Sequence, residues 1–147
     1  MRRVQRDATK EEFIQQIIDN KTGYFGEIWR LLLFAALLGK AKGHREPLEK
    51  VDTGKSIDAH IFKTSPPWPG IIHLLGVIEH GSSECLRKEN WENSLKLFEE
   101  YANGGLALLS EELGERATSM EAIVNFLLSD EQGRAGEIKA DISTIRL

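Results

Sequence analysis

Three short stretches contain residue types that could support chemistry, and the first resembles a nuclease motif. Glu137-Ile-Lys139 has the Glu-x-Lys spacing of many nucleases, in which the carboxylate helps to hold a metal ion and the lysine steadies the attacked phosphate. Such a site needs a second acidic ligand, and Asp130 and Asp141 are nearby in the sequence. Because this region is broken by glycine and shows little strand character, a small metal-dependent nuclease remains an alternative hypothesis.

The second stretch, Asp52-Thr-Gly-Lys-Ser56, ends like a phosphate-binding P-loop. A P-loop also needs a glycine five positions before Gly54, because its backbone amides must wrap around the phosphates. Position 49 is Glu49, and no apolar strand precedes the segment. We therefore interpret the stretch as a solvated turn.

The third stretch contains residues that could bind a metal, namely His73, His80, Glu84 and Cys85. Their spacing matches no accepted zinc motif. We therefore expect no metal and no cofactor. Cys85 is the only cysteine, which excludes an intrachain disulfide and fits a reducing compartment.

Two basic clusters, one within residues 2–10 and one within residues 40–45, are the strongest local indication of a binding surface. If the first two helices pack as an antiparallel pair, the start of the first and the end of the second lie at the same end of the bundle. The clusters would then form one patch that binds phosphates with strong salt dependence and little sequence preference. Lysines at a helix C-terminus also act as caps, so part of this charge needs no ligand. The predicted DNA-binding residues are Arg2, Arg3, Arg6, Lys10, Lys40, Lys42, His44 and Arg45.

Charge is unevenly distributed along the chain. Residues 1–45 carry nine Lys and Arg against five Asp and Glu, whereas residues 46–147 carry ten against eighteen. The acidic residues include Glu99-Glu100, Glu111-Glu112 and Glu115. We interpret them as a solvated helical face, with contact to a basic partner protein as the alternative.

The hydrophobic periodicity predicts a mainly α single-domain bundle of about five to six helices over residues 1–147. A short β-hairpin around residues 46–63 is left open, and we expect a tail from about residue 131 to be flexible until Ile142 and Ile145 dock. Capping boxes at Thr9–Glu12 and Thr118–Glu121 predict two helix starts. The expected helices cover about residues 9–18, 24–38, 70–79, 90–102 and 106–113, with a last one after residue 118. Gly39 is the expected C-cap of the second, and Ile71, Leu74, Leu75 and Ile78 are expected to face inward from the third. Asn103-Gly-Gly105 is expected to break or kink the chain after residue 102.

Length and hydropathy favour a cytoplasmic protein. The chain has 147 residues, which is typical of one domain. Its longest hydrophobic run, Leu31 to Leu38, is far shorter than the ~20 residues that a membrane span needs. The first residues lack the apolar core of a signal peptide. We therefore expect no membrane partner.

Three segments together resemble the Dnd system-associated protein 4 family of DNA phosphorothioation-associated proteins. They are Arg2-Arg-Val-Gln-Arg-Asp7, Phe34-Ala-Ala-Leu-Leu-Gly39 with its basic loop, and Leu97-Phe-Glu-Glu-Tyr-Ala-Asn-Gly-Gly-Leu106. The resemblance implies an accessory member of a bacterial gene cluster that acts with DNA sulfur modification in defence against foreign DNA. It supplies no catalytic residues for this chain.

The first hypothesis is thus a non-catalytic accessory subunit of a phosphorothioation-linked defence, or restriction, system. It would bind DNA, other proteins of the cluster, or both, and oligomerisation is left open. The alternatives are the nuclease with Glu137 and Lys139, and a module for protein–protein interaction alone.

Overall fold

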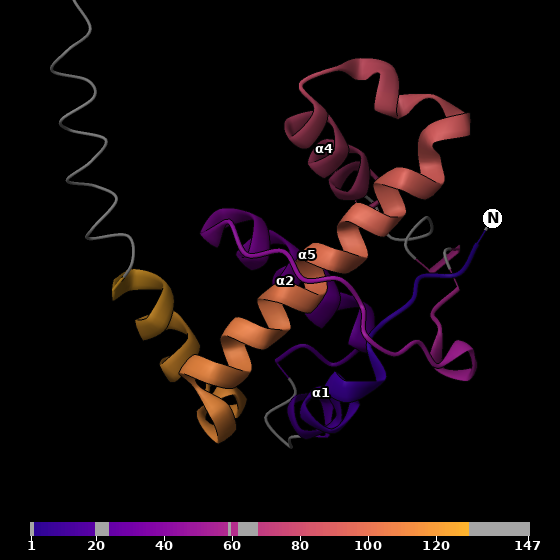
Figure 1. Cartoon of the computed structure of the whole chain (residues 1–147). Coiled ribbons are helices and arrows are strands. Elements are labelled where there is room, and N and C mark those ends of the chain that lie inside the picture. Colours follow the sequence, from indigo (N-terminus) through magenta and orange to yellow (C-terminus); the bar gives the residue numbers. More distant parts are fainter. Residues whose placement is uncertain (1, 20–23, 59, 62–67, 130–147) are drawn as a thin grey trace, which may run out of the picture.

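The computed structural model describes residues 2–19, 24–58, 60–61 and 68–129, and they form a mainly helical structure, as predicted (Figure 1). The longer helices are α1 (Glu11–Ile18), α2 (Ile28–Lys42), α4 (Trp68–His80) and α5 (Trp91–Glu112). Five short 3-10 turns are also present in the described residues, and residues 120–129 form a further helical segment. The predicted flexible tail and the nuclease-like residues Asp130, Glu137, Lys139 and Asp141 lie outside the described residues.

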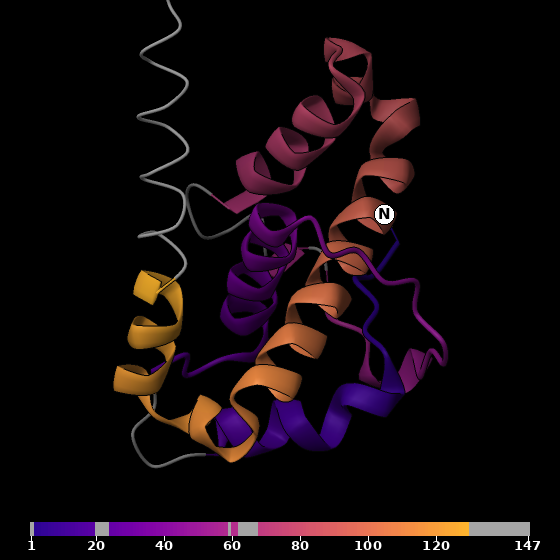
Figure 2. The same ribbon diagram turned by 60° about the vertical axis from the view of Figure 1, so that its left-hand side comes forward.

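Helix α5 is the central element, and α2 packs across its middle (Figure 2). The buried side of α2 includes Leu31, Leu32 and Ala35, and that of α5 includes Leu95, Phe98 and Leu109. α4 packs near the start of α5, whereas α1 and residues 120–129 lie near its end (Figure 1). None of the helices in the described part of the chain is both long and apolar enough to span a membrane.

The predicted break at Asn103-Gly-Gly105 is wrong, because α5 continues through it to Glu112. A methyl group on Gly105 would overlap the carbonyl oxygen of Ala35 in α2, and one on Gly104 would overlap the carbonyl oxygen of His44. The two glycines therefore permit close approach of neighbouring backbone. Packing against α2 offsets the low helix propensity of glycine.

The predicted end of α2 at Gly39 is also wrong. Gly39 lies inside the helix, where a methyl group would overlap the carbonyl oxygen of Tyr101. The helix ends at Lys42, and Gly43 adopts the left-handed conformation with φ 66°. The amides of Gly43 and His44 donate to the carbonyls of Lys40 and Gly39, at 3.1 and 2.8 Å, which is a Schellman cap.

The predicted inward stripe of α4 is correct for only half of its residues. Leu75 is buried and Ile71 packs against the core, but Leu74 and Ile78 are each 54% exposed. The buried side instead includes Ile72 and Gly76, because α4 packs on α5 and on the turn η3 (Ser83–Leu86) along that face. Periodicity alone did not separate these two faces, since α4 is apolar almost all round.

A hairpin within residues 46–63 is not confirmed. In the described residues, β pairing joins an N-terminal arm (residues 2–7) to a distant segment, through antiparallel bridges between Val4 and Ile57 and between Asp7 and Val51. The P-loop-like stretch forms an exposed 3-10 turn, η2 (Thr53–Lys55), capped by the Asp52 carboxylate. This placement agrees with the predicted solvated turn.

Each predicted capping box marks a helix start but assigns its cap to the wrong residue. Asp7 caps the turn η1 (Ala8–Lys10) that leads into α1, accepting from the Thr9 amide at 2.9 Å. Thr118 ends the turn η5 (Gly114–Thr118), and the Ser119 hydroxyl accepts from the Ala122 amide at 3.4 Å. In both places a nearby polar side chain caps the helical start instead.

Candidate nucleic-acid interface and the acidic end

Helix α5 brings the two predicted basic clusters together. The guanidinium of Arg2 donates to both carboxylate oxygens of Glu99, at 2.6 and 2.8 Å. The Arg45 Nε donates to the carboxylate of the next residue, Glu100, at 2.6 Å. The clusters thus converge, but on adjacent glutamates of α5 and not through an α1–α2 pair.

Glu46 joins the clusters at a second point. Its carboxylate lies 2.8 Å from His44 Nε2 and 3.8 Å from Lys10 Nζ. Lys10 opens the first helix, whereas His44 follows the second. The expectation that these two parts of the chain are neighbours is therefore correct, although a carboxylate lies between them.

Lys40 belongs to a small network between α2, α4 and α5. Its ammonium donates to Glu79 at 2.6 Å and lies 5.2 Å from the centre of the Tyr101 ring. The Tyr101 hydroxyl also donates to Glu79, at 2.8 Å. The hydrogen bond to Glu79 raises the pKa of Lys40, and the hydrogen bond from Lys40 lowers the pKa of Glu79.

Arg6 is buried and holds the start of α1. Its guanidinium donates to both oxygens of Glu11, at 2.8 and 3.1 Å, and to the carbonyl of Lys55. The hydrogen bond from Arg6 lowers the pKa of Glu11. Because its donors face these internal acceptors, Arg6 is poorly placed to contact a phosphate.

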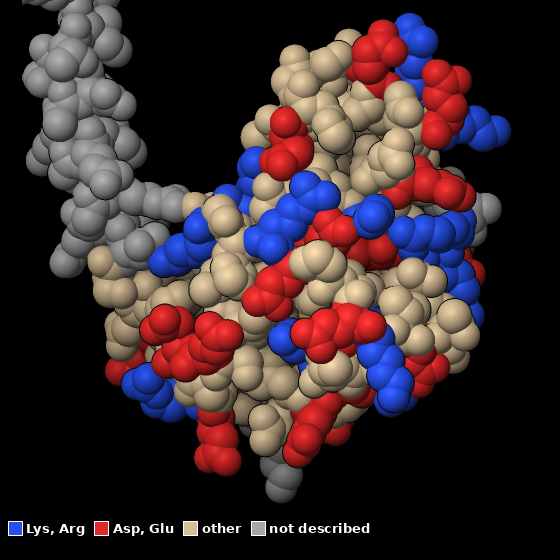
Figure 3. Space-filling view, viewed as in Figure 1, with Lys and Arg blue, Asp and Glu red and all other residues tan. Residues whose placement is uncertain are grey.

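Arg3 and Lys42 complete the predicted set. The Arg3 side chain is exposed, and Lys42 Nζ lies 4.8 Å from the centre of the Phe126 ring. Six of the eight predicted residues thus contact a carboxylate: Arg2, Arg6, Lys10, Lys40, His44 and Arg45. Figure 3 shows Lys and Arg interspersed with Asp and Glu across the middle of one face. DNA binding by these residues stays a prediction.

The segment Glu99–Gly105 holds other parts of the chain on α5, which the sequence analysis did not predict. Glu99 and Glu100 are only 4% and 7% exposed, so their assignment to a solvated face is wrong. Asn103 is also buried, and its Nδ2 donates to the carbonyl of Pro47 at 3.1 Å. These residues hold the N-terminal arm and residues 44–47 against α5. The nearby glycine pair, which marks close backbone approach, was the available signal.

A group of exposed glutamates lies at the other end of α5. We call Glu111, Glu112, Glu115 and Glu121 the acidic end; all four are exposed. Within the described residues, no ion pair joins any of them to a cation. Here the assignment of Glu111, Glu112 and Glu115 to a solvated face agrees with the structure.

Two of the residues considered as metal ligands, His73 and Cys85, have other close contacts. The His73 ring packs against Trp91 with centroids 4.9 Å apart, and the buried Cys85 thiol donates to the Ser82 carbonyl. In the described ranges, no three His, Cys, Asp or Glu side chains are grouped so as to hold a metal ion.

These features define a small helical protein whose basic residues mostly contact its own carboxylates, and whose polar motif on α5 organises the fold. The family model of DNA sulphur modification system-associated protein 4 matches residues 3–145, so the chain belongs to that family. This confirms the resemblance seen in the sequence. No curated protein and no solved structure matches the chain.

Proposed function

We propose that this protein is a non-catalytic accessory component of a DNA sulphur modification system, and that it works by binding another protein of that system. The family supports the setting. One observation supports binding through a protein surface: the basic and acidic residues differ in whether they are paired. Six of the predicted DNA-binding residues contact carboxylates, whereas no ion pair among the described residues joins the glutamates of the acidic end to a cation.

The polar residues of α5 support a binding role over a catalytic one. Glu99, Glu100 and Asn103 are the buried polar residues of the family-like motif, and each has a structural contact. A catalytic carboxylate must reach substrate, but these side chains are directed at the N-terminal arm and residues 44–47. A cytoplasmic location and a role in defence against foreign DNA are part of the same proposal.

Affinity purification from the native host tests the proposal. The expected result is stoichiometric enrichment of a DNA sulphur modification or restriction protein that persists after nuclease treatment. Enrichment of none of these proteins would refute the proposal. Loss of all of them on nuclease treatment would show that DNA, and not a protein surface, makes the connection.

DNA contact is a second candidate, because the end of α2 and the loop after it place Lys40, Lys42 and Arg45 within six positions, each at least partly exposed. If they contact phosphates, DNA affinity should fall steeply as salt is raised. Lys40→Ala with Lys42→Ala should flatten that slope by about two ions. Binding that is indifferent to salt and to both substitutions would exclude this candidate.

A further inference from the structure

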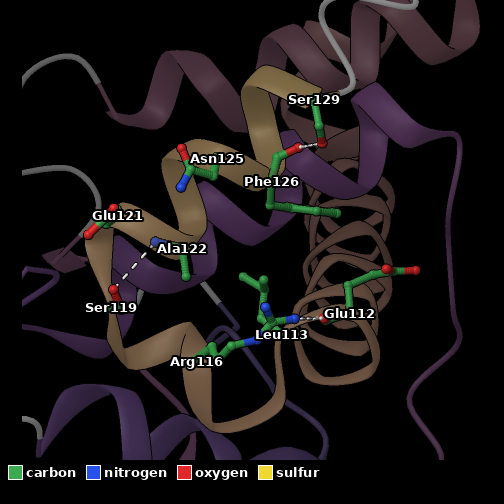
Figure 4. A pocket seen from close by; sticks show the side chains of 9 residues that line it. All are labelled: Glu112, Leu113, Arg116, Ser119, Glu121, Ala122, Asn125, Phe126 and Ser129. Atoms are coloured by element: carbon green, nitrogen blue, oxygen red, sulfur yellow. Dashed lines mark hydrogen bonds between the residues drawn. The ribbon is translucent and has the colours of Figure 1, made fainter.

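We infer that the groove between the end of α5 and helical residues 120–129 is a docking site for a basic amphipathic helix of a partner protein. This inference rests on the proposed function, because it names the surface and the chemistry of the contact. The groove has a volume of about 500 Å³ and is lined from α5, from η5 and from residues 120–129 (Figure 4).

The floor of the groove is apolar. Leu113 is buried beneath it, and Ala122 and Phe126 are half-buried along one side. The Phe126 side chain projects from residues 120–129 toward α5 (Figure 4). An apolar side chain from a partner would complete this surface by covering Phe126 and Leu113.

The rim of the groove carries carboxylate and amide side chains. Glu112 lies on the α5 side, whereas Glu121 and Asn125 lie on the opposite helix (Figure 4). Among the described residues that line the groove, Arg116 is the only lysine or arginine, and its Nη2 donates to the backbone carbonyl of Glu112 at 3.1 Å. Lys42 Nζ of α2 lies 4.8 Å from the centre of the Phe126 ring. The rim therefore complements a partner with several lysines or arginines.

The end of α5 independently favours a cationic partner. Glu111 and Glu112 occupy its last turn, which contains no basic residue. The C-terminus of a helix carries partial negative charge, so carboxylates there are unfavourable and cations are stabilising. Arg116 of the following turn already donates to the Glu112 carbonyl, and a lysine or arginine of the partner would add positive charge beside the Glu111 and Glu112 carboxylates.

A helical partner suits the shape of the apolar surface. Ala122 and Phe126, which line the groove, lie one turn apart on the same side of residues 120–129, so a partner helix can lie alongside both. Apolar residues at helical spacing on a partner can fill the groove while flanking basic residues reach the rim. The proposed occupant is thus a helix with a leucine-like stripe bordered by lysine or arginine.

The test is a titration of the isotope-labelled full chain, followed by amide NMR, with a synthetic helical peptide of leucine and lysine. The expected shift changes centre on Glu112, Ala122, Asn125 and Phe126. Glu112→Gln with Glu121→Gln should weaken binding about five- to tenfold, since two rim charges are lost. The matched control, Glu49→Gln with Glu92→Gln, removes two exposed charges elsewhere and should leave the affinity unchanged. A peptide with glutamate in place of lysine should not bind.

Four results would overturn the inference: no shifts, shifts centred elsewhere, equal weakening by both double variants, or equal binding of the glutamate peptide. Concentration-dependent shifts at the groove without peptide would identify a second copy as the occupant. Nuclear Overhauser contacts from residues 130–147 to Phe126 would identify the chain's own C-terminal segment. Either of these two results would also overturn the inference. If host proteins still co-purify when the groove fails, the proposed function stands and only this surface is wrong.

Discussion

Arg2 and Glu99 are 97 positions apart in the sequence, yet the Arg2 guanidinium donates two hydrogen bonds to the Glu99 carboxylate. The same carboxylate accepts from the backbone amide of Gln5 at 2.7 Å. Glu99 therefore holds the N-terminal arm on the middle of α5. Beside it, Glu100 holds residues 44–47 through Arg45, so two adjacent glutamates organise both basic clusters.

Removal of the Arg2 side chain should destabilise the fold. Arg2→Ala leaves the buried Glu99 carboxylate with one donor from the N-terminal arm, and we expect a loss of about 2–3 kcal/mol in the free energy of unfolding. Urea denaturation followed by circular dichroism measures it. Arg3→Ala is the control, because this exposed neighbour should change stability by less than about 0.5 kcal/mol. Equal effects of the two substitutions would contradict the assigned role of Arg2.

The contact between α2 and α5 should not tolerate a methyl group at Gly105. Gly105→Ala would overlap the Ala35 carbonyl and separate the helices, at a cost of about 3 kcal/mol. Gly70→Ala is a matched control in α4, where a methyl group would meet no atom within 4 Å. It should raise stability by about 0.5 kcal/mol, because alanine favours helix. Thermal melts of both variants test the pair, and a neutral Gly105→Ala would refute the close contact.

Asp7 should contribute to the loss of folding stability at low pH. Burial alone would raise its pKa, but the amides of Thr9 and Glu49 and the Thr9 hydroxyl hydrogen-bond its charged form, so its pKa lies below 3.8 in the fold. A lowered folded-state pKa adds stability that is fully present above the unfolded-state pKa and is lost as the pH falls through the folded-state pKa.

Asp7→Asn should therefore reduce stability at pH 7 and flatten its decline below about pH 4. Denaturation curves recorded from pH 7 to pH 2.5 provide the comparison. Asp52→Asn, at the exposed cap of η2, is the control. An unchanged acid slope in Asp7→Asn would show that this carboxylate does not matter for acid sensitivity.

Charge reversal at the end of α5 should stabilise the isolated protein. Glu112→Lys places a cation at the negative end of the helix, and we expect a gain of about 0.5 kcal/mol. Glu92→Lys, in the first turn of the same helix, should instead lower stability by a similar amount. Melting temperatures at low salt measure both, and a destabilised Glu112→Lys would show that additional positive charge is not favourable at the end of α5.

The sequence was sufficient to predict the helical class, and the family resemblance was correct. It was less informative where distant segments meet. Gly39 looked like a helix end and Gly104-Gly105 like a break, because local propensity takes no account of a crossing helix. Glu99 and Glu100 looked solvated because their partners, Arg2 and Arg45, are 97 and 55 positions away in the sequence.

The candidate site was likewise only partly predictable from the sequence. Spacing identified the two basic clusters, and the structure does bring them near each other. Spacing could not identify the carboxylates that pair with these residues, since Glu46, Glu79 and Glu100 come from three separate segments of the chain. The acidic end was recognisable as an exposed face, but its groove depends on the turn at residues 114–118.

We propose that the acidic end, and not the basic clusters, contacts the partner. The most direct measurement compares nuclease-treated purifications from the native host of wild type, Glu112→Lys with Glu121→Lys, and Lys40→Ala with Lys42→Ala. Quantitative mass spectrometry should find a DNA sulphur modification or restriction protein enriched with wild type and with the lysine variant, and lost with the glutamate variant. Retention by the glutamate variant together with loss from the lysine variant would contradict the claim.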